Sequence, residues 1–382
     1  MEHLIVEVSW GCPSKRYPLN GLFQFDQAKA LSDAGENIVF LALDMRSVRK
    51  WRKWGIVRSR KDGICVYEYN FPYGPMSPEF KYRIQDRCFE KSINAICAEQ
   101  GMPACVHFHG VMEAISGMKW CMEHHVPYVI TEHITPVKEG DEVHRRMTDA
   151  YRNADRIICV SNKLASDIKT AYGADTDAVI PNIVDLSLFE YSPDISGEGY
   201  RFISAAGLNA GKGFDVLLKA FGMLVSDVLS KEEGDIPHLT IMGDGVEKSR
   251  LKDLAESLGV AEYVTFTGEY IRSEFAEELR RSDCFVLASR SETFGIVYAE
   301  AMAAGVPVIA TRCGGPEDFV DSENGMLVPV GDASALAEAM TDMMSVSGEY
   351  DGQKISERCR NRFAPGTIAE KVRDVIRQCV SV

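Results

Sequence analysis

The sequence lacks an excess of positive charge. Its 382 residues include 42 lysines and arginines against 56 aspartates and glutamates, for a formal net charge of −14. Because non-specific affinity for nucleic acid comes from lysine and arginine, this balance predicts no nucleic-acid partner. No apolar run approaches the ~18 residues of a membrane-spanning helix. The first ten residues lack the basic start and apolar core of a signal peptide, so we expect a cytoplasmic protein.

Cysteine pairs at metal-ligand spacing are also missing. The eleven cysteines are scattered without a Cys-x-x-Cys pair, and Cys105, Cys159 and Cys284 fall inside apolar patterns. Such positions are typical of small core residues in a reducing compartment, and they argue against a disulfide framework or a zinc site.

The chain is long enough for two domains, because a single core seldom grows beyond ~250–300 residues. Short apolar runs alternate with helical patterns throughout, which predicts α/β units around parallel sheets. In the first half, strands are expected at 4–8, 37–43, 63–69, 105–109, 128–131, 156–160 and 178–180, with helices at 23–34, 81–100, 115–124, 142–152 and 163–171. In the second half, strands are expected at 201–205, 239–242, 264–267, 284–287, 306–310 and 326–328.

The polar, breaker-rich stretch 191–199 is the best linker candidate. We therefore expect one doubly wound domain over 1–190, a second over 200–364, and a final helix within 365–382. That helix is expected to open at Thr367, which starts the capping box Thr-Ile-Ala-Glu. Ligands of such sheets bind beyond the carboxyl ends of the strands.

Two glutamates eight residues apart, Glu292 and Glu300, stand out in the second half. Phe294 and Gly295 between them mark the expected start of a helix, which should end at Gly305. A helix N-terminus presents unpaired N–H groups and the positive end of a dipole, which together bind phosphate. Carboxylates near it can accept hydrogen bonds from sugar hydroxyls. The pattern predicts a nucleotide-sugar site; the simpler alternative is two solvated helix carboxylates.

Lys212 lies in the stretch Gly-Leu-Asn-Ala-Gly-Lys-Gly, at an expected strand-to-helix turn. The stretch is not a Walker A motif, because its first glycine is one residue too close and Gly213 replaces the hydroxyl that holds magnesium. A lysine at a helix N-terminus suits a diphosphate leaving group, and a surface lysine is the alternative. Gly21 follows the first expected strand and precedes a helix, where a glycine lets the backbone approach a ligand closely. Gly243 begins the loop Gly-Asp-Gly after another strand, which taken by itself is a common turn.

Histidines are few, and His107, His109 and His133 lie with Glu132 at the expected carboxyl ends of strands. Three interpretations stay open: a zinc site from His-x-His and a carboxylate, ordinary polar strand ends, and contact with a substrate or its proton. No ligand-spaced partner for a metal stands out, so we expect no metal and assign His109 and Glu132 to the acceptor side.

The segment from Arg46 to Lys61 carries eight positive charges and two tryptophans in an acidic chain. One interpretation is a solvated loop or short helix with partly packed tryptophans. The other is a patch that holds the protein on an anionic membrane face or against a lipid-linked acceptor.

Several motifs resemble the retaining glycosyltransferases of the GT-B fold, the large family called glycosyltransferase family 4 or group 1. The stretch from Ser289 to Glu317 resembles that family's E-x-F-G-x-x-x-x-E segment and the Gly-Gly-Pro-Glu that follows it. The stretch that begins at Gly207 is similar to its G-R-L-x-x-x-K-G-x-D-x-L-L, and Ile180 opens a match to its P-N-G-V-D.

The resemblance implies two Rossmann-like domains that face a central cleft, with the acceptor on the first and the donor on the second. It implies transfer of a sugar from a nucleoside-diphosphate donor, such as a UDP-sugar, to a saccharide or lipid-linked acceptor in polysaccharide or glycolipid synthesis. No metal or other cofactor is expected. The last helix is expected to cross back to the first domain.

The resemblance also implies roles for single residues. Glu300 would bind the ribose and Glu292 the donor-sugar hydroxyls. Lys212 and the backbone of Gly21 would neutralise the diphosphate, and the amides of Phe294 and Gly295 would assist at the sugar. His133 would lie beside the anomeric carbon, so His133, Glu292 and Lys212 are the expected catalytic residues. Donor binding is expected of Gly21, Lys212, Gly243, Glu292, Phe294, Gly295 and Glu300.

Two positions depart from the family pattern: Ile183 stands in place of the glycine of P-N-G, and Gly207 stands where the family has a phosphate-binding arginine. Either Arg312, Arg290 or Arg16 replaces it, or Lys212 acts with backbone amides alone. Two alternatives to a transferase follow: a nucleotide-sugar-binding protein without transfer, and another GT-B enzyme such as a phosphorylase or a nucleotide-sugar epimerase.

Overall fold

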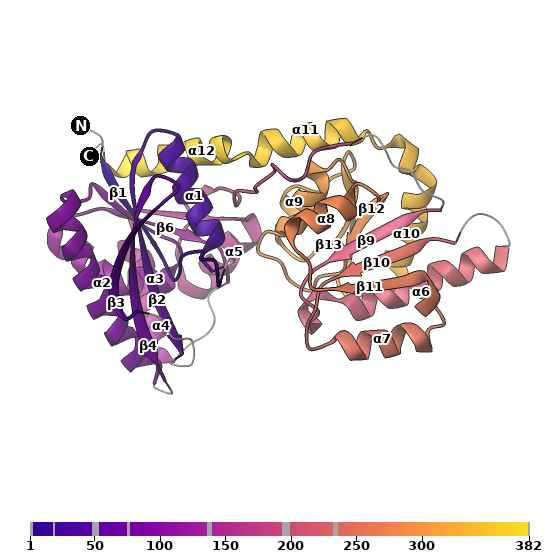
Figure 1. The fold of residues 1–382 in the computed structure, drawn as a ribbon, viewed down its shortest axis with the longest axis horizontal. Helices are drawn as coiled ribbons and strands as arrows, with labels where there is room; N and C mark the ends of the chain where they lie inside the picture. The colour runs from indigo at the N-terminus through magenta and orange to yellow at the C-terminus, as the bar shows by residue number, and fades with distance from the viewer. Residues whose placement is uncertain are drawn as a thin grey trace. The chain divides into compact units, whose positions relative to one another are not determined.

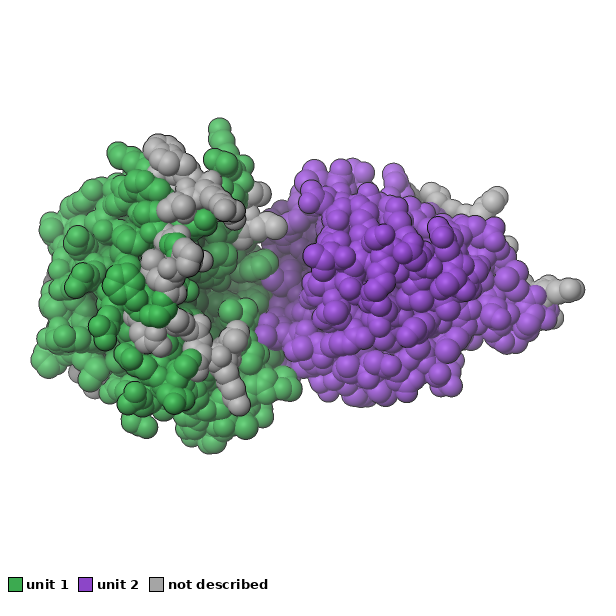
Figure 2. Space-filling view, turned by 90° about the horizontal axis from the view of Figure 1, so that it is seen from below, with its two compact units in different colours: residues 1–183, 365–382 green, residues 184–364 purple. Residues whose placement is uncertain are grey.

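The computed structural model describes residues 3–17, 20–47, 53–74, 77–135, 140–192, 199–231 and 236–380. Each of its two compact units is built on a sheet with helices on both faces, as the predicted α/β class requires (Figure 1). Unit 1 comprises residues 1–183 and 365–382, and unit 2 comprises residues 184–364 (Figure 2).

Unit 1 contains an eight-stranded sheet in the order β3-β4-β2-β1-β5-β6-β7-β8. Its strands are β1 (Leu4–Ser9), β2 (Asn37–Ser47), β3 (Gly55–Lys61), β4 (Ile64–Tyr73), β5 (Cys105–Phe108), β6 (Tyr128–Glu132), β7 (Arg156–Cys159) and β8 (Ala178–Val179). All described neighbours are parallel except β3 and β4. The strand order changes direction between β1 and β5, and ligands bind at such switch points.

The helices of unit 1 cover both faces of this sheet. They are α1 (Leu22–Asp33), α2 (Pro78–Gln100), α3 (Val111–His124), α4 (Asp141–Asn153), α5 (Asn162–Tyr172) and α12 (Pro365–Val380). The last helix lies beside α1 (Figure 1). There Ile368 joins a core cluster with Phe25 and Phe40. This helix begins at Pro365 rather than at the predicted Thr367, because proline suits the first helical position.

Unit 2 contains a fully parallel six-stranded sheet in the order β11-β10-β9-β12-β13-β14. Its strands are β9 (Arg201–Ala205), β10 (His238–Met242), β11 (Val264–Gly268), β12 (Cys284–Leu287), β13 (Val308–Thr311) and β14 (Gly325–Val328). Its helices are α6 (Phe214–Lys231), α7 (Lys248–Ser257), α8 (Arg272–Leu279), α9 (Ile296–Ala303), α10 (Ala333–Val346) and α11 (Gly352–Phe363). The described residues of this unit also form the short 3-10 turns η1 (Ala210–Lys212), η2 (Ala261–Tyr263), η3 (Gly315–Asp318) and η4 (Ser347–Glu349).

The chain passes from unit 1 to unit 2 earlier than the predicted linker at 191–199, of which 193–198 lie outside the described residues. Phe189 packs edge-on against Phe275 of α8, with ring centroids 5.9 Å apart. Arg360 of α11 donates a hydrogen bond of 2.5 Å to the carbonyl of Phe189. These contacts group the residues just before the predicted linker with unit 2.

The basic segment from Arg46 to Lys61 was predicted as a loop or short helix, and this prediction is wrong for its described ends. Its first residues end β2, and residues 55–61 form β3, antiparallel to β4. Residues 48–52 lie outside the described residues. Three of its cations are bound within the unit: Arg46 to Asp44 (2.8 Å), Arg58 to Glu99 (2.5 Å) and Lys61 to the carbonyl of Pro13 (3.1 Å).

Membrane contact through this segment therefore depends on its remaining cations and stays a prediction. Of the helices in the described part of the chain, none is long and apolar enough to cross a membrane.

Candidate active site

The switch point of the sheet in unit 2 lies between β9 and β12, and Lys212 and Glu292 follow these two strands. Lys212 ends the short turn η1, and Gly213 comes next with φ of 67°. A Cβ at Gly213 would lie 1.9 Å from the carbonyl oxygen of Ala288, so only glycine fits there. This close approach brings the two loops together.

Lys212 and Glu292 form an ion pair across the two loops. The Lys212 ammonium donates to Oε1 of Glu292 at 2.6 Å, and the Ser289 hydroxyl donates to the same oxygen at 2.7 Å. The lysine side chain is 29% exposed and the carboxylate 11%, so the pair is largely shielded from water. Because both bonds use Oε1, the carboxylate is held in one orientation, and Oε2 can accept a hydrogen bond from a ligand.

The backbone of Glu292 ties its loop to the loop after β13. Its N–H donates to the carbonyl of Cys313 at 3.1 Å, and its carbonyl accepts from the N–H of Gly315 at 2.8 Å. These bonds build the short bridge between Glu292 and Gly314. Gly314 and Gly315, the Gly-Gly pair of the sequence, thus help to position the loop that carries the Glu292 carboxylate.

Helix α9 begins and ends as predicted. Gly295 caps its start with φ of 92°, and Gly305 follows its end with φ of 82°. The ring of Phe294 is buried and packs against Phe319 and Phe363. The burial of the ring is compatible with the predicted donor contact, which was assigned to the backbone amide of Phe294 and stays a prediction.

Glu300 lies inside α9 and is buried, with 5% of its surface exposed. Arg272 donates two hydrogen bonds to Oε1 of Glu300, from Nε at 2.9 Å and Nη2 at 2.5 Å. It also donates to the carbonyl of Asp185 at 3.4 Å. Burial raises the pKa of Glu300, and the guanidinium limits that rise. Sequence reasoning missed Arg272, because no local pattern indicates a partner 28 residues away.

Gly243 follows β10 and holds the neighbouring loops together. Its φ is 140°, and a Cβ there would lie 1.9 Å from the carbonyl oxygen of Ala206. Its N–H donates to the carbonyl of Gly268 at 2.8 Å. The residue is therefore needed for close packing beside the Lys212 loop, whether or not it contacts a donor.

Gly207 is exposed, and only the amide nitrogen of Asn209 would come near a Cβ placed there, at 3.7 Å. Of the three arginines that could replace the missing one, Arg290 is bound to both carboxylate oxygens of Asp215, at 3.2 and 3.1 Å. Arg312 is exposed, and Arg16 lies over the ring of Tyr17 in unit 1. Arg290 is thus the least available of the three. Arg312 and Arg16 therefore stay the candidates to replace the missing arginine.

In unit 1, Gly21 caps the start of α1 with φ of 69°. A Cβ there would lie 2.1 Å from the carbonyl oxygen of Gly11, so the loop after β1 folds tightly on itself. Its predicted contact with the diphosphate stays a prediction.

The histidines of unit 1 form one network with a residue that sequence reasoning missed, Glu7 of β1. Because successive side chains of a strand alternate between faces, Glu7, His107 and His109 share a face of neighbouring strands. The Glu7 carboxylate is 2.9 Å from Nδ1 of His107 and 2.7 Å from Nε2 of His109. Nε2 of His107 is 2.7 Å from the hydroxyl of Thr131.

The network continues to His133, which is partly exposed. Nε2 of His133 lies 3.0 Å from Nδ1 of His109, and its Nδ1 lies 2.7 Å from Oδ1 of Asn182. Burial, followed by the neighbouring His109, lowers the pKa of His133 to about 3. His133 is therefore neutral near pH 7.

Glu132 is buried, and it points to the face of β6 opposite to Thr131, which contacts His107. It accepts hydrogen bonds from the N–H of Val111 (2.5 Å), at the start of α3, and from the hydroxyl of Tyr151 (2.8 Å). Burial raises the pKa of Glu132 to about 7. These contacts indicate a role in holding α3 and weigh against the predicted contact with an acceptor.

Among the described residues, Glu7, His107 and His109 gather their donor atoms closely enough for a cation. The Glu7 carboxylate is hydrogen-bonded to one nitrogen of each histidine. The other ring nitrogen of His107 contacts Thr131, and that of His109 contacts His133. The arrangement is thus explained without a metal, and metal independence stays a prediction.

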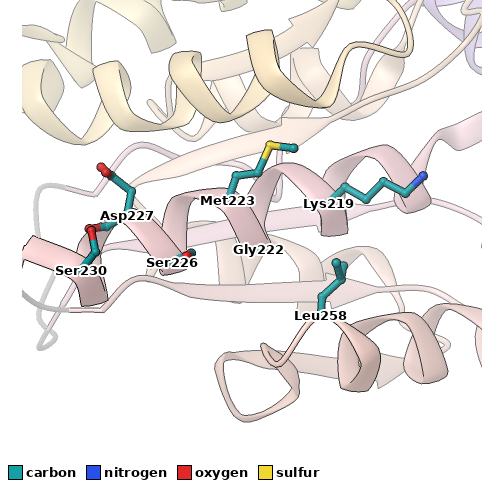
Figure 3. A pocket seen from close by; sticks show the side chains of 7 residues that line it. All are labelled: Lys219, Gly222, Met223, Ser226, Asp227, Ser230 and Leu258. Atoms are coloured by element: carbon teal, nitrogen blue, oxygen red, sulfur yellow. The ribbon is translucent and has the colours of Figure 1, made fainter.

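A shallow groove lies away from these residues, on the outer surface of α6 (Figure 3). It is lined by Lys219, Gly222, Met223, Ser226, Asp227, Ser230 and Leu258. These seven residues offer no histidine and no pair of carboxylates, so we assign no chemistry to the groove.

Comparison with known proteins agrees with this geometry. Residues 26–188 match the family Glycosyltransferase Family 4, and residues 191–362 match Glycosyl transferases group 1. The D-inositol 3-phosphate glycosyltransferase of Corynebacterium jeikeium (strain K411) is 31% identical over 318 residues, which cover 73% of this chain and 74% of that protein. A lipopolysaccharide core biosynthesis glycosyltransferase of Rhizobium meliloti is 30% identical over 200 residues, covering 51% and 55%.

The fold is also that of a solved structure, Anabaena HepE in complex with UDP. The two share a TM-score of 0.75 and 19% identity, with 99% of this chain and 100% of that chain covered. Because the two family matches together span both parallel-sheet units, and the relatives are glycosyltransferases, this chain belongs to the group 1 or family 4 glycosyltransferases of the GT-B fold.

Proposed function

We propose that this glycosyltransferase is a retaining, metal-independent enzyme. It moves a sugar from a nucleoside-diphosphate donor to a hydroxyl of a saccharide or lipid-linked acceptor. The observation that carries the proposal is the largely buried ion pair of Lys212 and Glu292 at the switch point of unit 2. It places a cation and a hydrogen-bond acceptor together at the carboxyl ends of the strands, where ligands of such sheets bind.

The two charges have complementary tasks in such a reaction. The Lys212 ammonium compensates the negative charge that grows on the departing diphosphate, which is the main means of catalysis available to a fixed cation. Oε2 of Glu292 accepts a hydrogen bond from a hydroxyl of the donor sugar, while Ser289 keeps the carboxylate in place. Close positioning of the acceptor oxygen supplies the remainder of the rate enhancement.

Glu300 provides the nucleotide end of the site. Its buried carboxylate accepts hydrogen bonds from ribose hydroxyls through Oε2, because Arg272 occupies Oε1. UDP is the first nucleotide to test, since the similar HepE structure contains UDP. The relative named for lipopolysaccharide core biosynthesis supports an acceptor in glycolipid or polysaccharide assembly.

A thermal-shift panel with UDP, GDP, ADP, CDP and dTDP, in the absence of metal, tests the donor site. A ligand at 100 times its Kd adds about 2.7 kcal/mol, or a few degrees for a chain of this size. We expect one nucleotide to stabilise the wild type and the exposed control Glu338→Ala, but not Glu300→Ala. Nuclear magnetic resonance of the sugar product then reads the anomeric configuration. No shift with any nucleotide would contradict the proposal, and an inverted product would contradict retention.

Gly207 favours one alternative, a protein that binds a nucleotide-sugar without transferring it. Phosphate contacts from arginine are bidentate, and glycine offers none. Nucleotide binding without release of free nucleotide from any donor, with or without acceptor, would support this alternative.

A further inference from the structure

Glu7 is a carboxylate buried in a strand whose other residues are apolar or small. Its side chain has no exposed surface, and its ion-pair partners among the described residues are His107 and His109. Although burial raises it, the charges and hydrogen bonds of these histidines lower the pKa of Glu7 to about 2. The carboxylate is therefore ionised, and a buried anion of this kind is stable only when a positive charge compensates it.

A row of three hydrogen bonds leads from this carboxylate through the partly exposed His133 to Asn182. We name Glu7, His109, His133 and Asn182 the Glu7 relay. Its bonds are 2.7 Å from Glu7 to His109, 3.0 Å between the two rings, and 2.7 Å from His133 to Oδ1 of Asn182. The two rings meet edge to edge, with centroids 5.3 Å apart and 25° between their planes.

The relay needs one proton more than neutral rings supply. Each of its three bonds contains a proton, whereas an ionised carboxylate and an amide oxygen carry none. His109 and His133 must therefore hold three protons, and two neutral imidazoles hold two. The extra proton gives the ring pair one positive charge, which compensates Glu7.

The position of that proton follows from the surroundings of the two rings. The pKa of His133 is lowered by burial and by its neighbour, so His133 is the neutral ring. Burial lowers the pKa of His109 below its usual value, and the hydrogen bond to the Glu7 carboxylate opposes that shift only in part. Because His109 is the ring that lies 2.7 Å from the Glu7 carboxylate, we assign to it the extra proton that the three bonds require, with one N–H toward Glu7 and the other toward His133.

We propose that Glu7 and His109 are positioning residues for His133, through a buried relay that fixes the orientation and tautomer of its ring. Nδ1 of His133 donates to Asn182, and Nε2 accepts from His109. The inference rests on the proposed function, which gives His133 its role beside the anomeric carbon. A ring bound at both nitrogens is held in one orientation, which is what a positioning role requires.

The relay is tested first by the wild-type protein alone. Nitrogen-15 spectra of histidine-labelled protein at pH 7 should show His109 protonated on both nitrogens and His133 protonated on Nδ1 only. Neutral His109, or a His133 proton on Nε2, would overturn the proposal. So would a stoichiometric metal ion in the purified protein.

The second test uses Glu7→Gln and His109→Gln, with His124→Gln on the outer part of α3 as the control. We expect kcat to fall by about 10- to 100-fold in the first two, with little change in donor KM, because positioning acts on the chemical step. His109 in Glu7→Gln should lose its extra proton. Unchanged kcat in both variants would overturn the relay.

The two proposals fail in different ways. A wild type that transfers no sugar would contradict the proposed function, while the nitrogen-15 spectrum would still decide the state of the relay. An active wild type with neutral His109 would leave the function standing and remove the relay. If Glu7→Gln does not fold, the wild-type spectrum remains decisive.

Discussion

Arg272 and Glu300 are joined by two hydrogen bonds to a single carboxylate oxygen, from Nε at 2.9 Å and from Nη2 at 2.5 Å. Only 6% of the glutamate side chain is exposed, against 27% for the arginine. The pair therefore fixes the carboxylate without consuming its second oxygen. The guanidinium also opposes the rise in the pKa of Glu300 that burial causes.

Replacement of Arg272 by methionine should weaken nucleotide binding by about tenfold or more and reduce stability by about 1–3 kcal/mol, since a buried carboxylate loses its partner. Titration calorimetry and urea unfolding measure the two effects. The double variant Arg272→Met, Glu300→Gln is the control: it should recover stability but not affinity. Unchanged affinity in Arg272→Met would contradict the positioning role.

Introduction of the missing arginine, Gly207→Arg, should strengthen nucleoside-diphosphate binding. The position is exposed, its φ is not in the left-handed region, and only Asn209 comes near a Cβ there. A charge-assisted bond to phosphate contributes about 1.5–3 kcal/mol, or roughly tenfold or more in Kd. Gly207→Met is the control for size without charge. Equal Kd values for both variants would show that the phosphates lie elsewhere.

Substitution of Lys212 should act mainly on the chemical step. We expect Lys212→Met to lower kcat by about 100-fold or more, because the departing diphosphate loses its cation. Glu292→Gln keeps the shape of the side chain and should raise donor KM as well as lower kcat. Steady-state kinetics measure kcat and donor KM separately for each variant. A Lys212→Met enzyme with unchanged kcat would exclude the lysine from catalysis.

Two neighbouring buried carboxyls in unit 1 should make stability fall as pH rises. Burial and the charge of Glu132 raise the pKa of Glu113 to about 8, and burial raises that of Glu132 to about 7. In the unfolded chain such groups ionise near pH ~4.3, so at higher pH the folded state holds protons that the unfolded state has lost. Stability therefore decreases from about pH 4.3 to the folded pKa values.

Scanning calorimetry above pH 7 tests this dependence, because His133, with its lowered pKa, contributes an opposite slope only below pH ~6.5. The Tm of the wild type should fall between pH 7 and 8, and that of Glu113→Gln should fall less. Parallel curves for the two proteins would refute the assignment.

The basic segment makes a separate prediction for membranes. Arg46, Arg58 and Lys61 hold contacts within unit 1, so substituting them would also remove those contacts. The residues to change to glutamine are Lys53, Arg60 and the three cations between 49 and 52. If this segment binds anionic membranes, the variant should sediment less with phosphatidylserine vesicles than the wild type. Equal sedimentation would exclude membrane contact through this segment.

Much of the fold could be predicted from sequence because hydrophobic periodicity is local. The helix from Ile296 to Ala303 and its glycine ends are examples. The strand β3 was missed, because its alternating arginines suggested a solvated loop, whereas Arg58 pairs with Glu99 of α2. Arg272 was missed for the same reason: its partner is distant in sequence.

Glu7 did leave a signal that sequence reasoning passed over. A lone carboxylate in the strand Leu-Ile-Val-Glu-Val-Ser requires a partner if the strand is buried. The His-x-His pair on a neighbouring strand was the obvious candidate. The face that these side chains share could not be known before the strand order placed β1 beside β5.

The last helix of the chain completes the first unit. Ile368 and the residues after it close a core whose other members come from the opening third and middle of the sequence. During synthesis on the ribosome, unit 2 can emerge in full and fold while unit 1 still lacks part of its apolar cover. The amino-terminal unit, although made first, thus cannot complete its core until α12 has been made.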